Sequence, residues 1–201
     1  GLVPVATFGD FELLKPLGEG GMSNVWLARL RRDTGFTKTV ALKRMLLQLI
    51  DRDDARQLFI DEARVTGSLR HPNIVEVYDC GETDGQLWLS MEFVDGWTLA
   101  HIVETLTKLG ERLPDAVIAD LFAQVCSALD YAHNATDDHG TPHHLVHRDI
   151  KPENIIVSRM GAAKLMDWGI VRADTNLRRT TEAGTARGTV LFMSPEQVRT
   201  R

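Results

Sequence analysis

The sequence predicts an α+β protein whose first half combines antiparallel strands with one helix and whose second half is mainly helical. A glycine-rich stretch, residues 18–25, separates two apolar stretches with the alternation of strands. Residues 55–69 place their apolar side chains on one helical face, and residues 114–133 do so over a longer stretch. Strands followed by helices, without regular alternation, are typical of the α+β class.

The composition is that of a soluble globular protein. The chain has 201 residues, 43% of them hydrophobic and 25% charged, and a formal net charge of −5. This balance argues against nucleic acid or an anionic membrane as a partner. No apolar run reaches the ~18 residues of a membrane-spanning helix. Cys80 and Cys126 share no metal-ligand spacing, so we expect two buried, reduced thiols and a cytoplasmic protein.

The first predicted elements are a lead-in over residues 1–10 and two strands around the glycine-rich stretch. Residues 11–17 and 25–28 alternate as strands do. A glycine-rich hairpin lets the backbone lie close against another group, although glycines in a hairpin are as often only a turn. Because the chain lacks an initiating methionine, we expect it to be a segment of a longer protein, which leaves room for a membrane anchor outside it.

The next strand, residues 39–43, ends in a lysine. Period two places Ala41 and Lys43 on one face and Val40 and Leu42 on the other. A lysine at the end of an apolar strand is usually a solvated edge residue. Its role therefore depends on what packs against that face.

The helix predicted over residues 55–69 supplies a candidate partner. Aspartates at positions 51, 53 and 54 favour its start, and its stripe at helical spacing consists of Phe59, Glu62, Ala63, Thr66 and Leu69. Glu62 thus lies within an apolar face, where a carboxylate is costly unless a cation meets it. Lys43 is the candidate cation. The alternative is a glutamate at the rim of the stripe.

The rest of the chain gives two more strands and then helices. Pro72 ends the first helix, strands follow at residues 74–78 and 86–93, and the turn between them is residues 83–85. Helices are predicted at residues 98–109 and 114–133. The second is interpreted as a core helix, with a stripe of Ile118, Leu121, Phe122, Val125, Leu129 and Ala132. The histidines of the polar loop that follows lack metal-ligand spacing.

The strongest chemical signal is the stretch HRDIKPEN at residues 147–154. It contains the carboxylate of Asp149, the ammonium of Lys151 and the carboxamide of Asn154, and Asp167 follows within a DWG stretch. Phosphoryl transfer needs such a group to receive a hydroxyl proton, cations to neutralise phosphate oxygens, and oxygen ligands for magnesium. Short strands at residues 155–157 and 163–166 flank these groups.

In combination these motifs resemble the protein kinase family. HRDIKPEN matches the catalytic loop of the family at every position that the motif defines, and the LFMSPEQ stretch at residues 191–197 is similar to bacterial serine/threonine members. The resemblance implies a two-lobed kinase-like fold: a small lobe of antiparallel sheet plus one helix at residues 11–91, a hinge at residues 92–95, and the first, incomplete part of a mainly helical large lobe at residues 96–201.

The resemblance also implies roles for the residues of the motifs. Asp149 would orient the substrate hydroxyl and accept its proton, and Lys151 would neutralise the moving phosphoryl group. Lys43, paired with Glu62, would hold the nucleotide phosphates. Asn154 and Asp167 would bind Mg²⁺, with Mn²⁺ as a substitute, and ATP would be the phosphoryl donor. The expected nucleotide-binding residues are Leu17, Gly18, Glu19, Gly20, Gly21, Met22, Ser23, Asn24, Val25, Ala41, Lys43, Met91, Glu92, Val94 and Ile156.

Two residues depart from the family pattern. Ser23 stands where a third glycine is usual, and Trp168 stands where phenylalanine is usual in the Asp-Phe-Gly motif. We expect the small serine to permit closure of the loop. We expect the Trp168 ring to pack inward against Thr66 and Val77.

The stretch at residues 170–187 corresponds to the activation segment of kinases, and we expect phosphorylation to order it. Thr180 and Thr181 are the first candidate sites and Thr185 is the next, with Arg148 as a partner for the phosphate. By resemblance, Lys151 and Thr189 point to serine and threonine acceptors in protein substrates. Self-association for autophosphorylation is compatible with this interpretation.

Two other classes remain open from the sequence. One is a pseudokinase that binds ATP and acts as a scaffold, which the presence of Lys43, Asp149, Asn154 and Asp167 disfavours. The other is a non-catalytic piece that associates with a partner through its large-lobe face. The substrate and the upstream signal are not encoded in these motifs.

Overall fold

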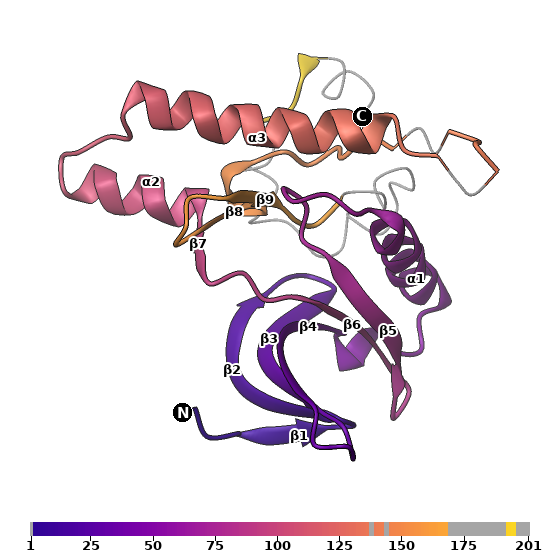
Figure 1. Ribbon diagram of the computed structural model, residues 1–201. Helices are drawn as coiled ribbons and strands as arrows, with labels where there is room; N and C mark the ends of the chain where they lie inside the picture. Colours follow the sequence, from indigo (N-terminus) through magenta and orange to yellow (C-terminus); the bar gives the residue numbers. More distant parts are fainter. Residues whose placement is uncertain (1, 137–138, 143–144, 169–191, 196–201) are drawn as a thin grey trace. The chain divides into compact units, whose positions relative to one another are not determined.

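The computed structural model describes residues 2–136, 139–142, 145–168 and 192–195 (Figure 1). The chain divides into two compact units, one formed by Gly1–Ser68 and Glu76–Phe93 and the other by Leu69–Val75 and Val94–Arg201. The division at residues 93 and 94 falls inside the stretch assigned to the hinge, while the lobe boundaries themselves stay a prediction. Within the described ranges, none of the helices has the length and apolar content that crossing a bilayer requires.

The first unit is built on a six-stranded antiparallel sheet in the order β1-β2-β3-β4-β6-β5. Its strands are β1 (Ala6–Phe8), β2 (Phe11–Glu19), β3 (Ser23–Arg31), β4 (Thr37–Met45), β5 (Val77–Thr83) and β6 (Gln86–Glu92). Strand β1 lies in the stretch interpreted as a lead-in. It is three residues long, too short for a periodic signal, and its pairing with β2 defines it.

One face of the sheet curls around an apolar cluster. Val40 and Leu42 of β4 are fully buried there, as the alternation of the strand predicts, and the rest of the cluster comes from β1, β2 and β3. The rings of Phe11 (β2) and Trp88 (β6) lie 5.0 Å apart, although β3 and β4 separate the two strands in the sheet. The sheet is therefore strongly curved (Figure 1).

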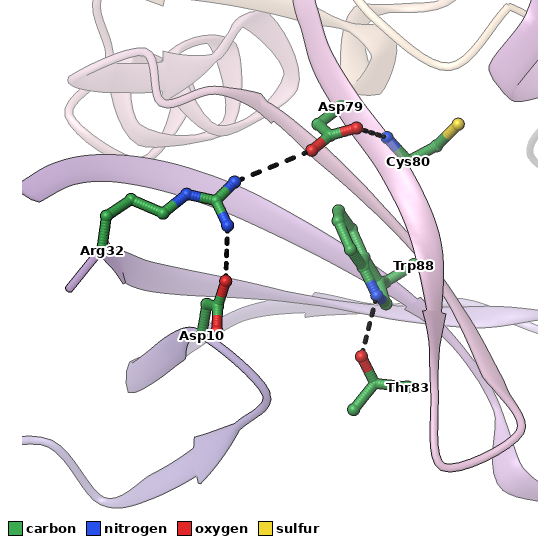
Figure 2. A network of polar contacts seen from close by, with 6 residues as sticks. All are labelled: Asp10, Arg32, Asp79, Cys80, Thr83 and Trp88. Atoms are coloured by element: carbon green, nitrogen blue, oxygen red, sulfur yellow. Dashed lines mark hydrogen bonds and ion pairs between the residues drawn. The ribbon is translucent and has the colours of Figure 1, made fainter.

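Polar contacts link the β1–β2 turn, the residue after β3 and strand β5, and a further one lies within the β5–β6 hairpin (Figure 2). Arg32, just after β3, lies 2.5 Å from Asp10 in the β1–β2 turn and 4.0 Å from Asp79 of β5. Trp88 Nε1 donates to Thr83 Oγ1 at 3.1 Å. Because the arginine and both carboxylates are about half exposed, these ion pairs contribute little to stability.

The other face of the sheet is covered by α1 (Asp53–Ser68), which follows a short 3-10 helix, η1 (Leu47–Leu49). In the predicted stripe, Phe59, Ala63 and Thr66 are buried, whereas Leu69 follows the last residue of the helix and belongs to the other unit. Phe59 and Ala63 pack with residues of β4, β5 and β6 in a second apolar cluster. Helix α1 is thus fixed against the face of β4 that carries Lys43.

The described part of the second unit contains a three-stranded sheet and two long helices. Its elements are β7 (Gly96–Thr98), α2 (Leu99–Lys108), α3 (Asp115–His133), the 3-10 helix η2 (Pro152–Asn154), β8 (Ile155–Ser158) and β9 (Ala163–Leu165). The sheet order is β7-β8-β9. The Thr98 side chain accepts a hydrogen bond from the His101 N–H at 3.2 Å and caps α2. The helix therefore begins at Leu99, one residue after the predicted start.

The segment Leu69–Val75 belongs to this unit, so the prediction of a strand at residues 74–78 is wrong in its first half. Ile74 makes only an isolated bridge to Leu165, and Asn73 donates to Gln124 of α3 and to the Ala163 carbonyl, each at 2.9 Å. These contacts hold the segment against α3 and β9. Strand β5 therefore begins at Val77.

Two burial predictions are wrong. In the α3 stripe, Leu121 and Val125 are buried, but Ile118 and Phe122 are 38% and 55% exposed. Cys80 and Cys126 are free thiols, as expected for a reduced protein, but both are exposed. Cys80 lies on the edge strand β5, and Cys126 lies on α3 away from its buried side.

Candidate active site

The first unit brings Lys43 and Glu62 together. Lys43 Nζ lies 2.5 Å from Glu62 Oε1, with the two side chains 10% and 16% exposed. Glu62 is held on its helix beside Thr66, whose hydroxyl donates to the Glu62 carbonyl at 2.6 Å. The strand face and the helical stripe therefore meet as predicted, and the interpretation of Glu62 as a rim residue is excluded by this contact.

The glycine-rich stretch is the tight connection between β2 and β3. Gly18 and Glu19 pair with Val25 and Asn24, and the Gly20 N–H donates to the Ser23 carbonyl at 2.8 Å. A Cβ placed on Gly18 would meet no atom within 4 Å, so the glycine is not required by packing within the loop. Its absence of a side chain leaves room for a phosphate group to approach the backbone.

The other predicted nucleotide contacts are divided between the units. Ala41 pairs with Met91 across β4 and β6, Leu17 lies on β2, and Glu92 ends β6. Val94 and Ile156 belong to the second unit. The Glu92 N–H donates to the Glu76 carbonyl at 2.8 Å. Adenine binding by these residues stays a prediction.

The second unit brings together Asp149, Lys151 and Asn154. Lys151 Nζ and Asn154 Nδ2 lie 3.2 Å and 3.3 Å from the same carboxylate oxygen, Asp149 Oδ2. Asn154 Nδ2 also donates to the Asp149 backbone carbonyl at 2.9 Å, and η2 places this amide, since the Asn154 N–H donates to the Lys151 carbonyl. The carboxylate of Asp149, 12% exposed, is thereby fixed in orientation.

The environment of Asn154 fits a hard metal ion. Its Nδ2 is committed to Asp149, which turns Oδ1 to the opposite side of the amide. The Asp167 carboxylate follows β9, and the Met166 N–H donates to the Asn154 carbonyl at 3.0 Å, so the two segments are adjacent. One amide and one carboxylate oxygen are typical of magnesium held jointly with substrate phosphates. The described residues contain no larger cluster of acidic, histidine or cysteine ligands.

His147 is a positioning residue that the sequence analysis did not identify, although it opens the HRDIKPEN motif. It is 1% exposed, its Nδ1 accepts from the Asp149 N–H at 3.3 Å, and its Nε2 lies 3.1 Å from the Met166 carbonyl. An acceptor at Nδ1 and a donor at Nε2 require the neutral imidazole. Burial lowers the pKa of His147, which favours this form.

Backbone strain accompanies these contacts. Arg148 and Asp167 have φ of 62° and 53°, in the left-handed region that non-glycine residues rarely occupy. Such conformations persist when surrounding contacts hold them, and they gather at active sites. Next to Asp167, Trp168 is 2% exposed and its ring lies 4.7 Å from that of His147. The inward packing of Trp168 is as predicted, whereas its contact with Thr66 and Val77 stays a prediction.

The candidate site thus consists of two groups of residues, each formed within its own unit. Lys43 and Glu62 meet in the first, and Asp149, Lys151 and Asn154 meet in the second. Their joining around one nucleotide stays a prediction. Thr180, Thr181 and Thr185 lie outside the described residues.

The lysine–glutamate pair of the first unit and the aspartate–lysine–asparagine loop of the second are each the arrangement expected of protein kinases. The sequence matches the protein kinase domain over residues 11–201. The chain therefore belongs to the protein kinase family. Its matches identify it as a kinase of the bacterial, eukaryotic-like type.

Three relatives illustrate the similarity. The chain is 34% identical over 200 residues to tyrosine-protein kinase MasK of Myxococcus xanthus, which covers 99% of the chain and 31% of the relative. It is 38% identical over 190 residues to serine/threonine-protein kinase PknE of Mycobacterium bovis, covering 94% and 31%. It is 36% identical over 191 residues to serine/threonine-protein kinase PrkC of Bacillus subtilis, covering 95% and 27%.

Solved structures agree with the fold. The chain matches a crystal structure of the Mycobacterium tuberculosis PknI kinase domain with a TM-score of 0.63 and 34% identity, over 85% of this chain and 64% of that one. The two-lobed, kinase-like fold class is thereby confirmed. The chain spans about a third of the length of its curated relatives and about two thirds of the solved kinase domain.

Proposed function

We propose that this chain is the catalytic part of a serine/threonine protein kinase that transfers the γ-phosphoryl group of ATP to hydroxyl groups of protein substrates. The observation that carries the proposal is the Asp149–Lys151–Asn154 arrangement, in which two donors orient one carboxylate. The match to the kinase domain over residues 11–201 supports it. The presence of every catalytic group disfavours the pseudokinase alternative.

Asp149 accepts the proton of the substrate hydroxyl in this proposal. Its value is positional, because the transition state of phosphoryl transfer is loose and needs little base strength. Lys151, 3.2 Å from the Asp149 carboxylate, orients it and supplies positive charge where the transferred phosphoryl group gains negative charge. The bridging oxygen between the β- and γ-phosphorus atoms keeps the electrons of the broken P–O bond and departs as part of ADP. The substrate hydroxyl oxygen, whose proton passes to Asp149, forms the new P–O bond.

The metal-binding role falls to Asn154 Oδ1 and the Asp167 carboxylate. When bound there, Mg²⁺ supplies charge neutralisation between the phosphates, and Mn²⁺ is the expected substitute. Lys43 contacts the nucleotide phosphates, and its salt bridge to Glu62 fixes the position of the ammonium. The glycine loop, residues 18–25, covers the phosphates with backbone N–H groups.

Transfer of labelled phosphate from ATP to a protein substrate tests the proposal, with the full-length protein and Asp149→Asn compared. We expect Mg²⁺-dependent transfer by the native protein and its loss in the variant. Nucleotide-dependent thermal stabilisation without any transfer by the native protein would instead favour a scaffold that binds ATP.

The acceptor residue needs its own test, because one relative with 99% coverage of the chain is named a tyrosine-protein kinase. We propose serine and threonine, the acceptors in the names of PknE and PrkC. Phosphoamino acid analysis of the labelled products distinguishes the two. Phosphotyrosine as the main product would contradict the assignment.

Regulation by autophosphorylation is part of the same proposal. We expect Thr181 or Thr180 to be modified first and Thr185 next after incubation with Mg²⁺ and ATP, through self-association of two molecules, and mass spectrometry measures this. Unmodified threonines in an active preparation would contradict it. A cytoplasmic site of action is proposed as well, since ATP and free thiols such as Cys80 and Cys126 occur there.

A further inference from the structure

The buried polar atoms of the chain single out two tryptophans. Among the described residues, the buried side-chain nitrogen and oxygen atoms without a hydrogen-bond partner are Trp26 Nε1 and Trp168 Nε1. Buried donors are paired in the great majority of cases, so each exception requires an explanation. The two sites differ in their surroundings, because Trp26 lies on β3 in the curled sheet and Trp168 follows Asp167.

The surroundings of Trp168 leave its indole N–H without an acceptor. The ring that packs against it, His147, has both nitrogens committed: Nδ1 accepts from the Asp149 N–H and Nε2 donates to the Met166 carbonyl. Phenylalanine, which is usual at this position, would bury a smaller aromatic ring that has no donor. The tryptophan therefore adds a desolvation penalty to the arrangement in which the ring is buried.

The desolvation penalty of the Trp168 N–H acts next to a proposed metal ligand. Trp168 directly follows Asp167, whose backbone is already in the left-handed region. A movement that exposes the indole N–H to water removes the penalty, and it also moves the adjacent carboxylate. The backbone of Asp167 and Trp168 thus carries both a proposed magnesium ligand and a buried, unpaired donor whose desolvation penalty favours movement of the segment away from this position.

We propose that the unpaired indole N–H of Trp168 is a conformational brake that reduces the fraction of molecules holding Asp167 beside the catalytic loop. This inference rests on the proposed role of Asp167 in Mg²⁺ binding. Trp168 is then a positioning residue, which acts on the metal site through the backbone of its neighbour. An unpaired buried donor shifts such an equilibrium by about 5- to 150-fold.

Replacement of single tryptophans by 3-benzothienylalanine tests the brake, because this residue has nearly the shape of tryptophan but no N–H. In the full-length protein, the unfolding equilibrium and the Mg²⁺ concentration for half-maximal ATP binding are measured. For Trp168 we expect higher stability, seen as an equilibrium constant of unfolding that is about 5- to 150-fold lower. We also expect a lower Mg²⁺ requirement, which is the Mg²⁺ concentration for half-maximal ATP binding. Unchanged or reduced stability would overturn the inference, since it would mean that the N–H has an acceptor.

The other three tryptophans of the chain are matched controls. At Trp26 we expect higher stability with an unchanged Mg²⁺ requirement, because that residue belongs to the other unit. At Trp88, whose Nε1 donates to Thr83, we expect lower stability, and at Trp97, which is 45% exposed, little change. A Trp168 variant that gains stability but keeps the native Mg²⁺ requirement would also overturn the brake. Failure of the native protein to bind ATP with Mg²⁺ would contradict the proposed function and leave the stability comparison intact.

Discussion

The two halves of the candidate site are built in different ways. Lys43 and Glu62 lie 19 positions apart, on a strand and a helix that meet only because an apolar stripe fixes α1 to the sheet. Asp149, Lys151 and Asn154 lie within six consecutive residues, and one turn of 3-10 helix arranges them. The first half is a product of tertiary packing, whereas the second is largely a local conformation.

This difference teaches where each half is vulnerable. The salt bridge depends on the position of a whole helix, so a change in packing can break it without touching either residue. The loop depends on the hydrogen bond that Asn154 donates to Asp149 and on the one that the Asp149 N–H donates to His147, so single polar substitutions there act directly.

The largest effect is expected at Asp149. Replacing Asp149 by alanine removes the group that orients the substrate hydroxyl, and we expect phosphate transfer to fall by about 10²- to 10⁴-fold. Thermal stabilisation by ATP and Mg²⁺ serves as the control, because it reports binding without chemistry. An Asp149→Ala protein with more than about a tenth of native activity would contradict the assigned role.

The next effect is expected at Glu62. Glu62→Gln keeps the shape of the side chain but removes the charge that Lys43 meets at 2.5 Å in a site where both are mostly buried. We expect a loss of about 2 kcal/mol in the free energy of unfolding, measured with urea, which is typical of a lost hydrogen bond between charged groups. The single variant Lys43→Met and the double variant complete a double-mutant cycle. If the two losses in unfolding free energy simply add, the salt bridge contributes nothing to stability.

A smaller effect is expected from protonation. Burial lowers the pKa values of His147 and His71 in the folded protein below the ordinary value of ~6.5. Below that pH the unfolded chain binds protons that the folded chain does not, so stability is present above pH ~6.5 and is lost as the pH falls toward the folded pKa. Urea unfolding between pH 7.5 and 5 measures this.

A variant identifies the source of the pH dependence. His147→Gln keeps polar groups near Asp149 and Met166 but cannot titrate, so its stability should depend less steeply on pH than that of the native protein. His71→Gln is the matched variant at the other histidine with a lowered pKa, whose partly buried ring lies 5.2 Å from that of Tyr131 of α3. Identical slopes in the native protein and both variants would contradict the assignment.

The smallest effect is expected at the surface. Arg32 joins Asp10 and Asp79 through exposed ion pairs (Figure 2), and Arg32→Met should cost less than about 1 kcal/mol of unfolding free energy. The loss in unfolding free energy at Arg32 is compared with the loss at Glu62, because both substitutions remove one charge of a salt bridge and only the pair at Glu62 is mostly buried. High salt should reduce the effect at Arg32 more than the effect at Glu62. A loss at Arg32 equal to that at Glu62 would show that the closure of the curved sheet depends on these charges.

Much of the chain could be predicted because its signals are local. The stripe of α1, the two faces of β4 and the HRDIKPEN loop are encoded by spacing within a few turns or residues. The burial pattern follows the first two, and the side chains of Asp149, Lys151 and Asn154 lie together in the third. Strand β1 and the start of β5 could not be predicted. They are defined by pairing with distant residues and by the anchoring of Asn73 on α3, which no local period reveals.

The sequence by itself determined the chemistry of this protein: which residues carry charge, in what order, and on which face of each element. Tertiary structure alone decided that Lys43 meets Glu62, that the His147 ring is buried against the Met166 carbonyl, and that the Trp168 ring is buried with its N–H unpaired. The physical reason is that hydrogen bonding and desolvation depend on which groups surround an atom in the folded chain, and residues distant in sequence supply those groups.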